Sequence, residues 1–141
     1  MLEIEYKKKV FMGLMAQGWD VQFHEDSVSN FIPDVSMGGH GVDVWIEVKY
    51  EEHPPKKISD IKHWTRGQEK WLKDRGRSGC GFCYLLIGSG HEHMLFRWNT
   101  LNNIRKATWE DAAAWACVRA GTIPGIVKAI DDWLTTEADY G

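Results

Sequence analysis

The stretch Val42-Asp43-Val44-Trp45-Ile46-Glu47-Val48-Lys49-Tyr50 has the strongest strand pattern in the sequence and decides the fold. It is dense in β-branched and aromatic residues, which favour strands. Because side chains alternate between the two faces of a strand, Val42, Val44, Ile46, Val48 and Tyr50 share one face, which needs a core. The other face carries Asp43, Trp45, Glu47 and Lys49. The sequence therefore predicts a strand with one aliphatic face and one face that carries carboxylate and ammonium groups.

A shorter extended segment before this strand predicts a hairpin. The segment Ile32-Pro33-Asp34-Val35-Ser36 has its proline at the entrance of the strand, where a missing N–H is tolerated. Gly38-Gly39-His40-Gly41 predicts the turn. Alternation from Trp19 to His24 predicts one further half-buried strand. The hairpin turn can then bring Asp34 close to Glu47 across the strand pair.

A first helix is predicted from Leu2 to about Gln17, where apolar residues recur at helical spacing before Gly18. At 100° per residue, Glu3 falls within the apolar stripe of this helix. Either this acid takes part in a site beneath the helix, or it only occupies a frayed first turn, where the helix dipole favours an acid.

A second helix is predicted after the Pro54-Pro55 break. Ser59 or Thr65 could cap its start, the helix runs to Arg75, and Gly76 ends it. Its inward stripe consists of Ile61, Trp64, Gln68, Trp71 and Leu72. Gln68 is a polar residue within that stripe.

Two further strands and a helical tail complete the pattern. Gly81 to Ile87 predicts a buried strand, and His93 to Trp98 predicts its hairpin partner. In the tail, Thr108 caps a helix that includes Ala112 to Ala120, and a last helix runs from Pro124 to about Thr135. Strands followed by a helix and more strands predict an α/β fold with a mixed sheet.

Length and composition fit a single globular domain over residues 1–141, with 43% hydrophobic residues. No stretch approaches the roughly 18 apolar residues that cross a bilayer, and the first residues carry acids where a signal peptide has a basic and then apolar run. We therefore expect a soluble cytoplasmic protein with no membrane partner and no small-molecule organic cofactor. Three cysteines are too few for a disulfide framework.

The charge distribution is uneven. A net charge of −3 argues against a protein that coats nucleic acid by bulk charge. Residues 56–77, however, contain eight basic residues against three acids. Such a stretch is often only a solvated helix face, but it also suits phosphate binding. The candidate DNA-binding residues are Lys62, Arg66, Lys70 and Lys73.

The candidate site combines Asp34 with Glu47 and Lys49. Two carboxylates at short range repel each other unless a cation lies between them, and hard oxygen ligands suit Mg²⁺ or Mn²⁺. The backbone carbonyl of Val48 could be another ligand. Lys49, on the same face as Glu47, could orient or deprotonate a water, or offset charge on a phosphate. The alternative is structural, with Asp34 in a turn and Glu47 and Lys49 in a solvated salt bridge.

This constellation, Pro33-Asp34 followed by Glu47-Val48-Lys49, resembles the signature of the PD-(D/E)XK nuclease superfamily. Gln68 on the next helix is similar to the glutamine of the stand-alone VRR-NUC branch, which is often found in phages and is related to Holliday-junction resolvases. The resemblance implies a restriction-endonuclease-like core of helix, three-strand meander, helix and strands over about residues 2–98. A helical extension would follow over about residues 100–138.

By this resemblance, Asp34, Glu47, Lys49 and Gln68 would be the catalytic residues. Asp34 and Glu47 would hold the metal, and Glu3 would match the acid of the first helix as a further ligand. The implied activity is a Mg²⁺- or Mn²⁺-dependent DNA endonuclease that leaves 5′-phosphate and 3′-hydroxyl ends. It could nick or select a DNA structure, and it could be phage-encoded and act in a host cytoplasm. Cutting both strands at once would need two copies, which suits a homodimer.

Two other hypotheses stay open. The chain could be a catalytically inactive module that binds nucleic acid or protein on the same fold. It could also be a zinc or redox protein that uses the CxxC spacing of Cys80 and Cys83, although only His91 and His93 lie nearby in sequence as further ligands. His40 and His53, which flank the central strand, could contact DNA.

Overall fold

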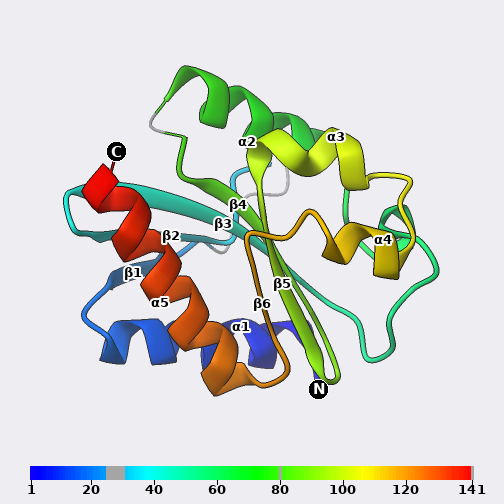
Figure 1. Cartoon of the computed structure of the whole chain (residues 1–141), viewed down its shortest axis with the longest axis horizontal. Coiled ribbons are helices and arrows are strands. Elements are labelled where there is room, and N and C mark those ends of the chain that lie inside the picture. The colour runs from blue at the N-terminus through cyan, green and yellow to red at the C-terminus, as the bar shows by residue number, and fades with distance from the viewer. Residues whose placement is uncertain (25–30, 80, 141) are drawn as a thin grey trace.

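The computed structural model describes residues 1–24, 31–79 and 81–140 as a six-stranded sheet between two layers of helices (Figure 1). The strands lie in chain order across the sheet. Neighbouring strands are antiparallel except for the parallel pair β3 and β4. The strands are β1 (Asp20–Phe23), β2 (Val35–Gly39), β3 (Val42–Tyr50), β4 (Cys83–Ser89), β5 (Glu92–Arg97) and β6 (Val118–Ala120). The helices are α1 (Glu3–Ala16), α2 (Arg66–Ser78), α3 (Leu101–Ile104), α4 (Trp109–Ala113) and α5 (Ile123–Tyr140).

The central strand β3 has the bounds and the two faces that its alternation predicts. Its aliphatic side chains Val44, Ile46 and Val48 are fully buried in a core shared with α1 and α5. Trp45, on the opposite face, packs against a second core that is formed with α2, α3 and α4. Because β3 and β4 run parallel, the chain crosses from one to the other through α2. The crossover places α2 over the face that carries Glu47 and Lys49.

The hairpin between β2 and β3 is tighter than predicted. Gly38 and Gly39 were expected in the turn, but they extend β2 and pair with Asp43 and Val42. The turn consists of His40 and Gly41, which have φ values of 53° and 79°. A two-residue hairpin turn favours positive φ at both positions, and His40 and Gly41 both adopt it, so this pair alone forms the turn. The start of the strand also shifts, from the expected Ile32 to Val35.

Helix α2 begins after Thr65, one of the two expected caps. The Thr65 hydroxyl accepts a hydrogen bond from the Gln68 amide, and the Gln68 side chain accepts one from the Thr65 amide. This capping box leaves Ile61 and Trp64 before the helix instead of within its stripe. The expected end at Gly76 is wrong, because the helix continues to Ser78.

Gly76 has a packing role within α2. A Cβ atom built at this position would lie 2.2 Å from Cγ of Trp98, so only glycine lets the helix approach this indole ring. From sequence alone, a glycine near a helix end predicts that the helix stops there. In this protein the contact with Trp98 explains why residue 76 is a glycine.

The tail differs most from expectation. Thr108 caps α4 through the Asp111 amide, but the expected helix over Ala112 to Ala120 is wrong. After a short α4 the chain forms β6, which pairs with β5. Hydrogen bonds at this sheet edge outweigh the helix preference of an alanine-rich segment. Helix α5 then packs beside α1 (Figure 1), and no described helix is long and apolar enough to cross a membrane.

We expect Gly76→Ala to lower the free energy of unfolding by about 1–3 kcal/mol, because the added methyl group must displace Trp98. In an open helix the same change would raise stability by up to about 1 kcal/mol. Urea denaturation measures the difference. Gly121→Ala is the control, since its added Cβ would lie 3.4 Å from its nearest neighbour, the His91 carbonyl oxygen. A more stable Gly76→Ala protein would contradict the packing role.

Candidate active site

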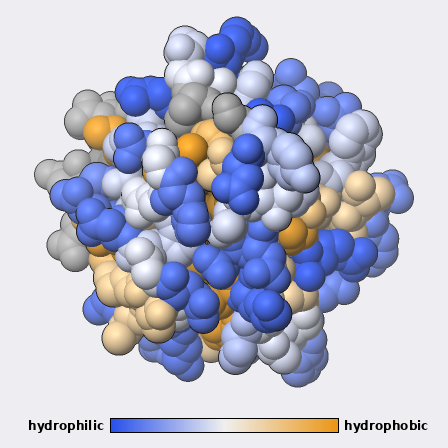
Figure 2. Space-filling view, turned by 60° about the vertical axis from the view of Figure 1, so that its left-hand side comes forward, coloured by the Kyte–Doolittle hydropathy of each residue, from blue (hydrophilic) through white to orange (hydrophobic). Residues whose placement is uncertain are grey.

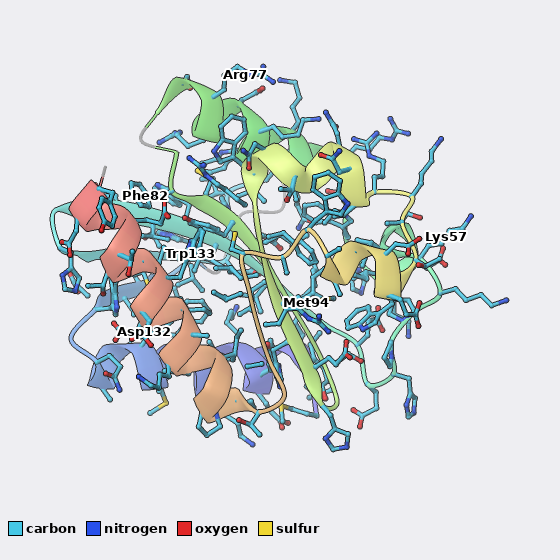
Figure 3. The ribbon with its side chains drawn as sticks, in the orientation of Figure 1. Lys57, Arg77, Phe82, Met94, Asp132 and Trp133 are labelled. Carbon is cyan, nitrogen blue, oxygen red and sulfur yellow. The ribbon has the colours of Figure 1, made fainter. Side chains whose placement is uncertain are left out.

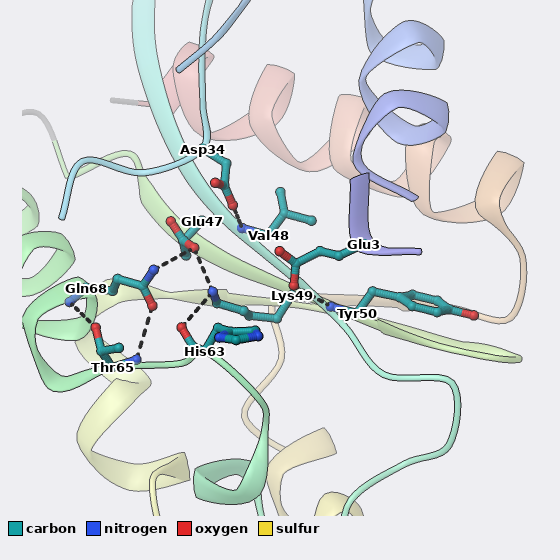
Figure 4. Close-up of polar contacts among 9 residues, drawn as sticks. All are labelled: Glu3, Asp34, Glu47, Val48, Lys49, Tyr50, His63, Thr65 and Gln68. Atoms are coloured by element: carbon teal, nitrogen blue, oxygen red, sulfur yellow. Dashed lines mark hydrogen bonds and ion pairs between the residues drawn. The ribbon is translucent and has the colours of Figure 1, made fainter. Parts of the chain in front are cut away.

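Asp34, directly before β2, and Glu47, in the second half of β3, lie side by side (Figure 4). The antiparallel register pairs Val35 with Ile46, so Asp34 stands opposite Glu47. The Asp34 carboxylate accepts a hydrogen bond of 3.1 Å from the Val48 amide, which ties it to the backbone of β3. Asp34 is half-buried, whereas Glu47 is 2% exposed. Solvent therefore reaches this pair from the Asp34 side.

The Glu47 carboxylate is held by two donors on the same oxygen. Nζ of Lys49 lies 3.1 Å from Oε2, and Nε2 of Gln68 donates to Oε2 at 3.2 Å. Lys49 is itself buried, and its ammonium group also donates to the His63 carbonyl at 2.8 Å. Strand β3 and helix α2 thus converge on one carboxylate, and the segment before α2 holds its lysine partner (Figure 4).

Burial and the negative charge of Asp34 raise the pKa of Glu47 to about 8, although the Lys49 ammonium group acts in the opposite direction. When both carboxylates are ionised, they carry one more negative charge than Lys49 offsets, which together with burial is why Glu47 holds its proton more tightly than usual. A divalent cation would relieve this repulsion. The donor set suits Mg²⁺, which binds through one or two carboxylates and keeps several waters or phosphate oxygens as its other ligands.

Two other predicted metal ligands lie close to the site, and the charges of Lys49 and Asp34 both act on the pKa of Glu3. The carboxylate of Glu3 accepts a hydrogen bond of 3.4 Å from the Tyr50 amide, and burial raises its pKa. The side chain of Val48 is buried in the core with α1, and its amide contacts Asp34. Among the described residues, no three His, Cys, Asp or Glu side chains are grouped so that they could hold a metal ion. The ligand roles of Glu3 and of the Val48 carbonyl stay predictions.

Three of the four predicted DNA-binding residues gather on the outer side of α2. Arg66, Lys70 and Lys73 line an open hollow of about 400 Å³ together with Arg77 and Arg105, and the carboxylates of Glu69 and Asp74 also line it. We call this the basic hollow, since its five cations outnumber its two acids. Lys62 lies before α2 and is exposed, but it is not part of this hollow. Arg77 extends from α2 away from the sheet (Figure 3). On the face seen in Figure 2, hydrophilic side chains predominate and hydrophobic ones are interspersed among them.

Sequence reasoning missed two groups near the site. Arg105, from the tail, makes hydrogen bonds to both oxygens of the Glu69 carboxylate, which is 3% exposed and also pairs with Lys73 at 3.5 Å. The partners are 36 residues apart, so no local pattern connects them. The second group is the His63 carbonyl, a backbone acceptor without a sequence signature. A positive φ of 63° at this residue is the only local feature that marks it.

The remaining predicted groups lie elsewhere. His40 and His53 are exposed, and their contact with DNA stays a prediction. Cys80 lies outside the described residues, whereas Cys83 is fully buried in β4. His93 hydrogen-bonds the Tyr6 hydroxyl at 2.9 Å, so its ring already has a partner within the core.

Comparison with known proteins identifies the fold. No protein-family model matches this sequence, and no curated protein matches it. Among solved structures, the chain is similar to Hjc from Archaeoglobus fulgidus, a Holliday junction resolvase from an archaeal hyperthermophile. The TM-score is 0.61 at 15% identity, over 92% of this chain and 98% of that one. At this identity the likeness shows a shared fold, a mixed α/β architecture of the resolvase kind.

The raised pKa of Glu47 predicts a pH dependence of stability. Without metal, the folded protein retains a proton on Glu47 that the unfolded chain releases above its ordinary pKa of 4.5. The stability that the protonated Glu47 contributes to the folded state is fully present below pH 4.5 and is lost as the pH rises toward about 8. Relative to Glu47→Gln, the wild-type protein should lose up to about 1.4 kcal/mol per pH unit in this window. Urea denaturation in EDTA at several pH values measures the difference, and parallel profiles would contradict the prediction.

Proposed function

We propose that this protein is a metal-dependent endodeoxyribonuclease that hydrolyses phosphodiester bonds at the Asp34–Glu47 site. The observation that carries the proposal is the convergence of Asp34, Glu47, Lys49 and Gln68 on one point at the centre of the sheet. The likeness to a Holliday junction resolvase supports it, since that fold is the one expected from the resemblance to the PD-(D/E)XK superfamily.

Each side chain has a task in the proposed reaction. Asp34 and Glu47 would hold Mg²⁺ or Mn²⁺, which when bound stabilises charge on the phosphate and promotes ionisation of water. Lys49 orients the Glu47 carboxylate and places a positive charge beside the scissile phosphate. Gln68 donates to Glu47 and fixes the carboxylate relative to α2. In the net reaction water adds to phosphorus, the bond to the 3′ oxygen breaks, and a 5′-phosphate and a 3′-hydroxyl remain.

The basic hollow on α2 would contact the DNA backbone. Its guanidinium and ammonium groups come from Arg66, Lys70, Lys73, Arg77 and Arg105. Contacts from such groups to phosphates position the DNA but do not read its sequence. The Glu69 carboxylate holds Arg105 in place from below. Membership of the VRR-NUC branch, a phage origin, a cytoplasmic location and a homodimer remain predictions.

Cleavage assays test the proposal directly. With Mg²⁺ or Mn²⁺, the wild-type protein should cut at least one of a panel of supercoiled, linear, nicked, flapped and four-way-junction DNAs, and EDTA should abolish cutting. Asp34→Asn and Glu47→Gln should each reduce the rate at least about 100-fold, because they weaken the cation site and leave the fold in place. Lys128→Ala on α5, an exposed position far from the site, is the control. Full activity in EDTA or in Glu47→Gln would contradict the proposal, and DNA binding without any cutting would favour the inactive module.

The backbone contacts predict a dependence on salt. Arg66→Ala and Lys70→Ala should weaken binding to all DNA sequences alike, and each should reduce the slope of log K against log salt by about 1. Fluorescence anisotropy in metal-free buffer from 50 to 200 mM salt measures the slope. Lys128→Ala is a matched control, since Lys128 and Lys70 are both exposed and both pair with an aspartate four residues later. An unchanged slope in the α2 variants would place the DNA elsewhere.

A further inference from the structure

A groove lies on the same sheet face as the candidate active site, over the strands that α2 does not cover. The core beneath α2, α3 and α4 draws its strand residues from β3, β4 and β5, and no described helix packs on β1 and β2 on this face. The groove has a volume of about 310 Å³. Its main lining residues are Asp20, His24, Ser36, Gly38, Asp43 and Trp45.

The groove lies beside the carboxylate site along β2 and β3. Trp45 precedes Glu47 by two residues in β3 and shares its face, which places the groove wall about 6.6 Å along the strand from the site. In the neighbouring strand, Ser36 pairs with Trp45 and lies two residues after Asp34. The His24 amide donates to the Asp34 carbonyl at 2.8 Å. A DNA strand with its phosphate at Asp34 and Glu47 would therefore bring an adjacent nucleotide to this groove.

The wall of the groove is built from stacked rings. The His24 ring lies nearly parallel to Trp45, with centroids 5.4 Å apart and an angle of 22°. Trp71 of α2 packs on Trp45 at 5.3 Å, and the exposed Arg75 guanidinium group lies 4.9 Å from the Trp71 ring centroid. Unstacked bases bind to aromatic rings and to arginine planes of this kind.

The charges of the groove favour a base over a phosphate. Asp20 and Asp43 are exposed carboxylates in the lining, and they would repel a phosphate group. Carboxylates accept hydrogen bonds from the amino groups of bases, such as N4 of cytosine. The basic hollow on the outer side of α2 offers the backbone a separate place. The groove would therefore contact the base, and the basic hollow would contact the phosphate backbone.

The floor contains a glycine that the local backbone does not require. Gly38 lies within β2, its φ is not positive, and an added Cβ would meet nothing closer than 3.6 Å. Glycine in a strand interior lowers stability and marks a close approach of a ligand or another backbone. The neighbouring Gly39 differs, because its Cβ would lie 2.6 Å from Trp19. Packing explains Gly39, whereas Gly38 keeps the floor of the groove open.

We propose that this groove binds one unpaired nucleobase next to the scissile phosphate, with His24 and Trp45 as its stacking wall. The substrate class is then DNA with unpaired or unstacked nucleotides at the cut, such as a single strand or a branch point. Fully paired DNA would first have to lose stacking and pairing at that base. This inference rests on the proposed DNA-cleaving function.

Binding in EDTA tests the groove without requiring cleavage. The probes are a fluorescein-labelled 12-nucleotide single strand and a strand of equal length made of abasic residues, compared by anisotropy. The wild-type protein should bind the base-containing strand about tenfold more tightly. Gly38→Val should bring the two affinities within about twofold, because the side chain fills the floor. Lys70→Ala should weaken both equally, and Gly121→Val, the same change at a glycine outside the groove, should alter neither.

The outcomes separate the two proposals. If Gly38→Val folds with a melting temperature near that of the wild type and keeps the full preference for bases, the groove proposal is wrong. If Gly38→Val does not fold, Gly38→Ser and His24→Ala replace it under the same criterion. A base preference that these variants abolish, together with no cutting of any DNA in Mg²⁺ or Mn²⁺, would sustain the groove and overturn the nuclease. Cutting without a base preference would do the reverse.

Discussion

The buried carboxylate of Glu47 is the constraint on which the architecture around the site depends. A charge at 2% exposure is costly unless it is paired and hydrogen-bonded. Lys49 comes from the same strand, and Gln68 comes from the first turn of α2. Gln68 also forms the capping box with Thr65. The same side chain therefore fixes the start of α2 and donates a hydrogen bond to the buried Glu47 carboxylate. Moving the helix by a single residue would separate Gln68 from both partners.

The two faces of β3 explain how a buried site remains reachable. The aliphatic face is closed by α1 and α5, and on the other face α2 covers β3 to β5. Helix α2 does not extend over β1 and β2, so Asp34, at the border, is half-buried, whereas Glu47 and Lys49 are each 2% exposed. Access is therefore one-sided. The basic hollow lies on the outer side of α2 and the polar groove lies over β1 and β2, so the DNA strand proposed to bind at the site would contact both surfaces.

Local patterns in the sequence were sufficient for the elements that form the site. Alternation located β3 and its faces, and hairpin spacing located Asp34 opposite Glu47. The features that could not be predicted depend on tertiary contacts. Gly76 resembles a helix stop until Trp98 is known to lie against it. The segment over Val118–Ala120 follows alanine-rich sequence and becomes a strand only because β5 offers an edge. The Glu69–Arg105 pair joins residues 36 positions apart, and the His63 carbonyl is a backbone atom.

The tail is integrated into the structure that supports the site. Strand β6 pairs with β5, which would otherwise present an open edge for association with other chains. Ile126, Ile130 and Leu134 of α5 are fully buried in the core beneath α1. Arg105 joins the basic hollow and is fixed there by Glu69 of α2. The residues after β5 thus complete the sheet, contribute to both cores and add a cation to the surface proposed for DNA. Completion of the fold and assembly of that surface are therefore coupled, because α2 cannot present the whole hollow without the tail.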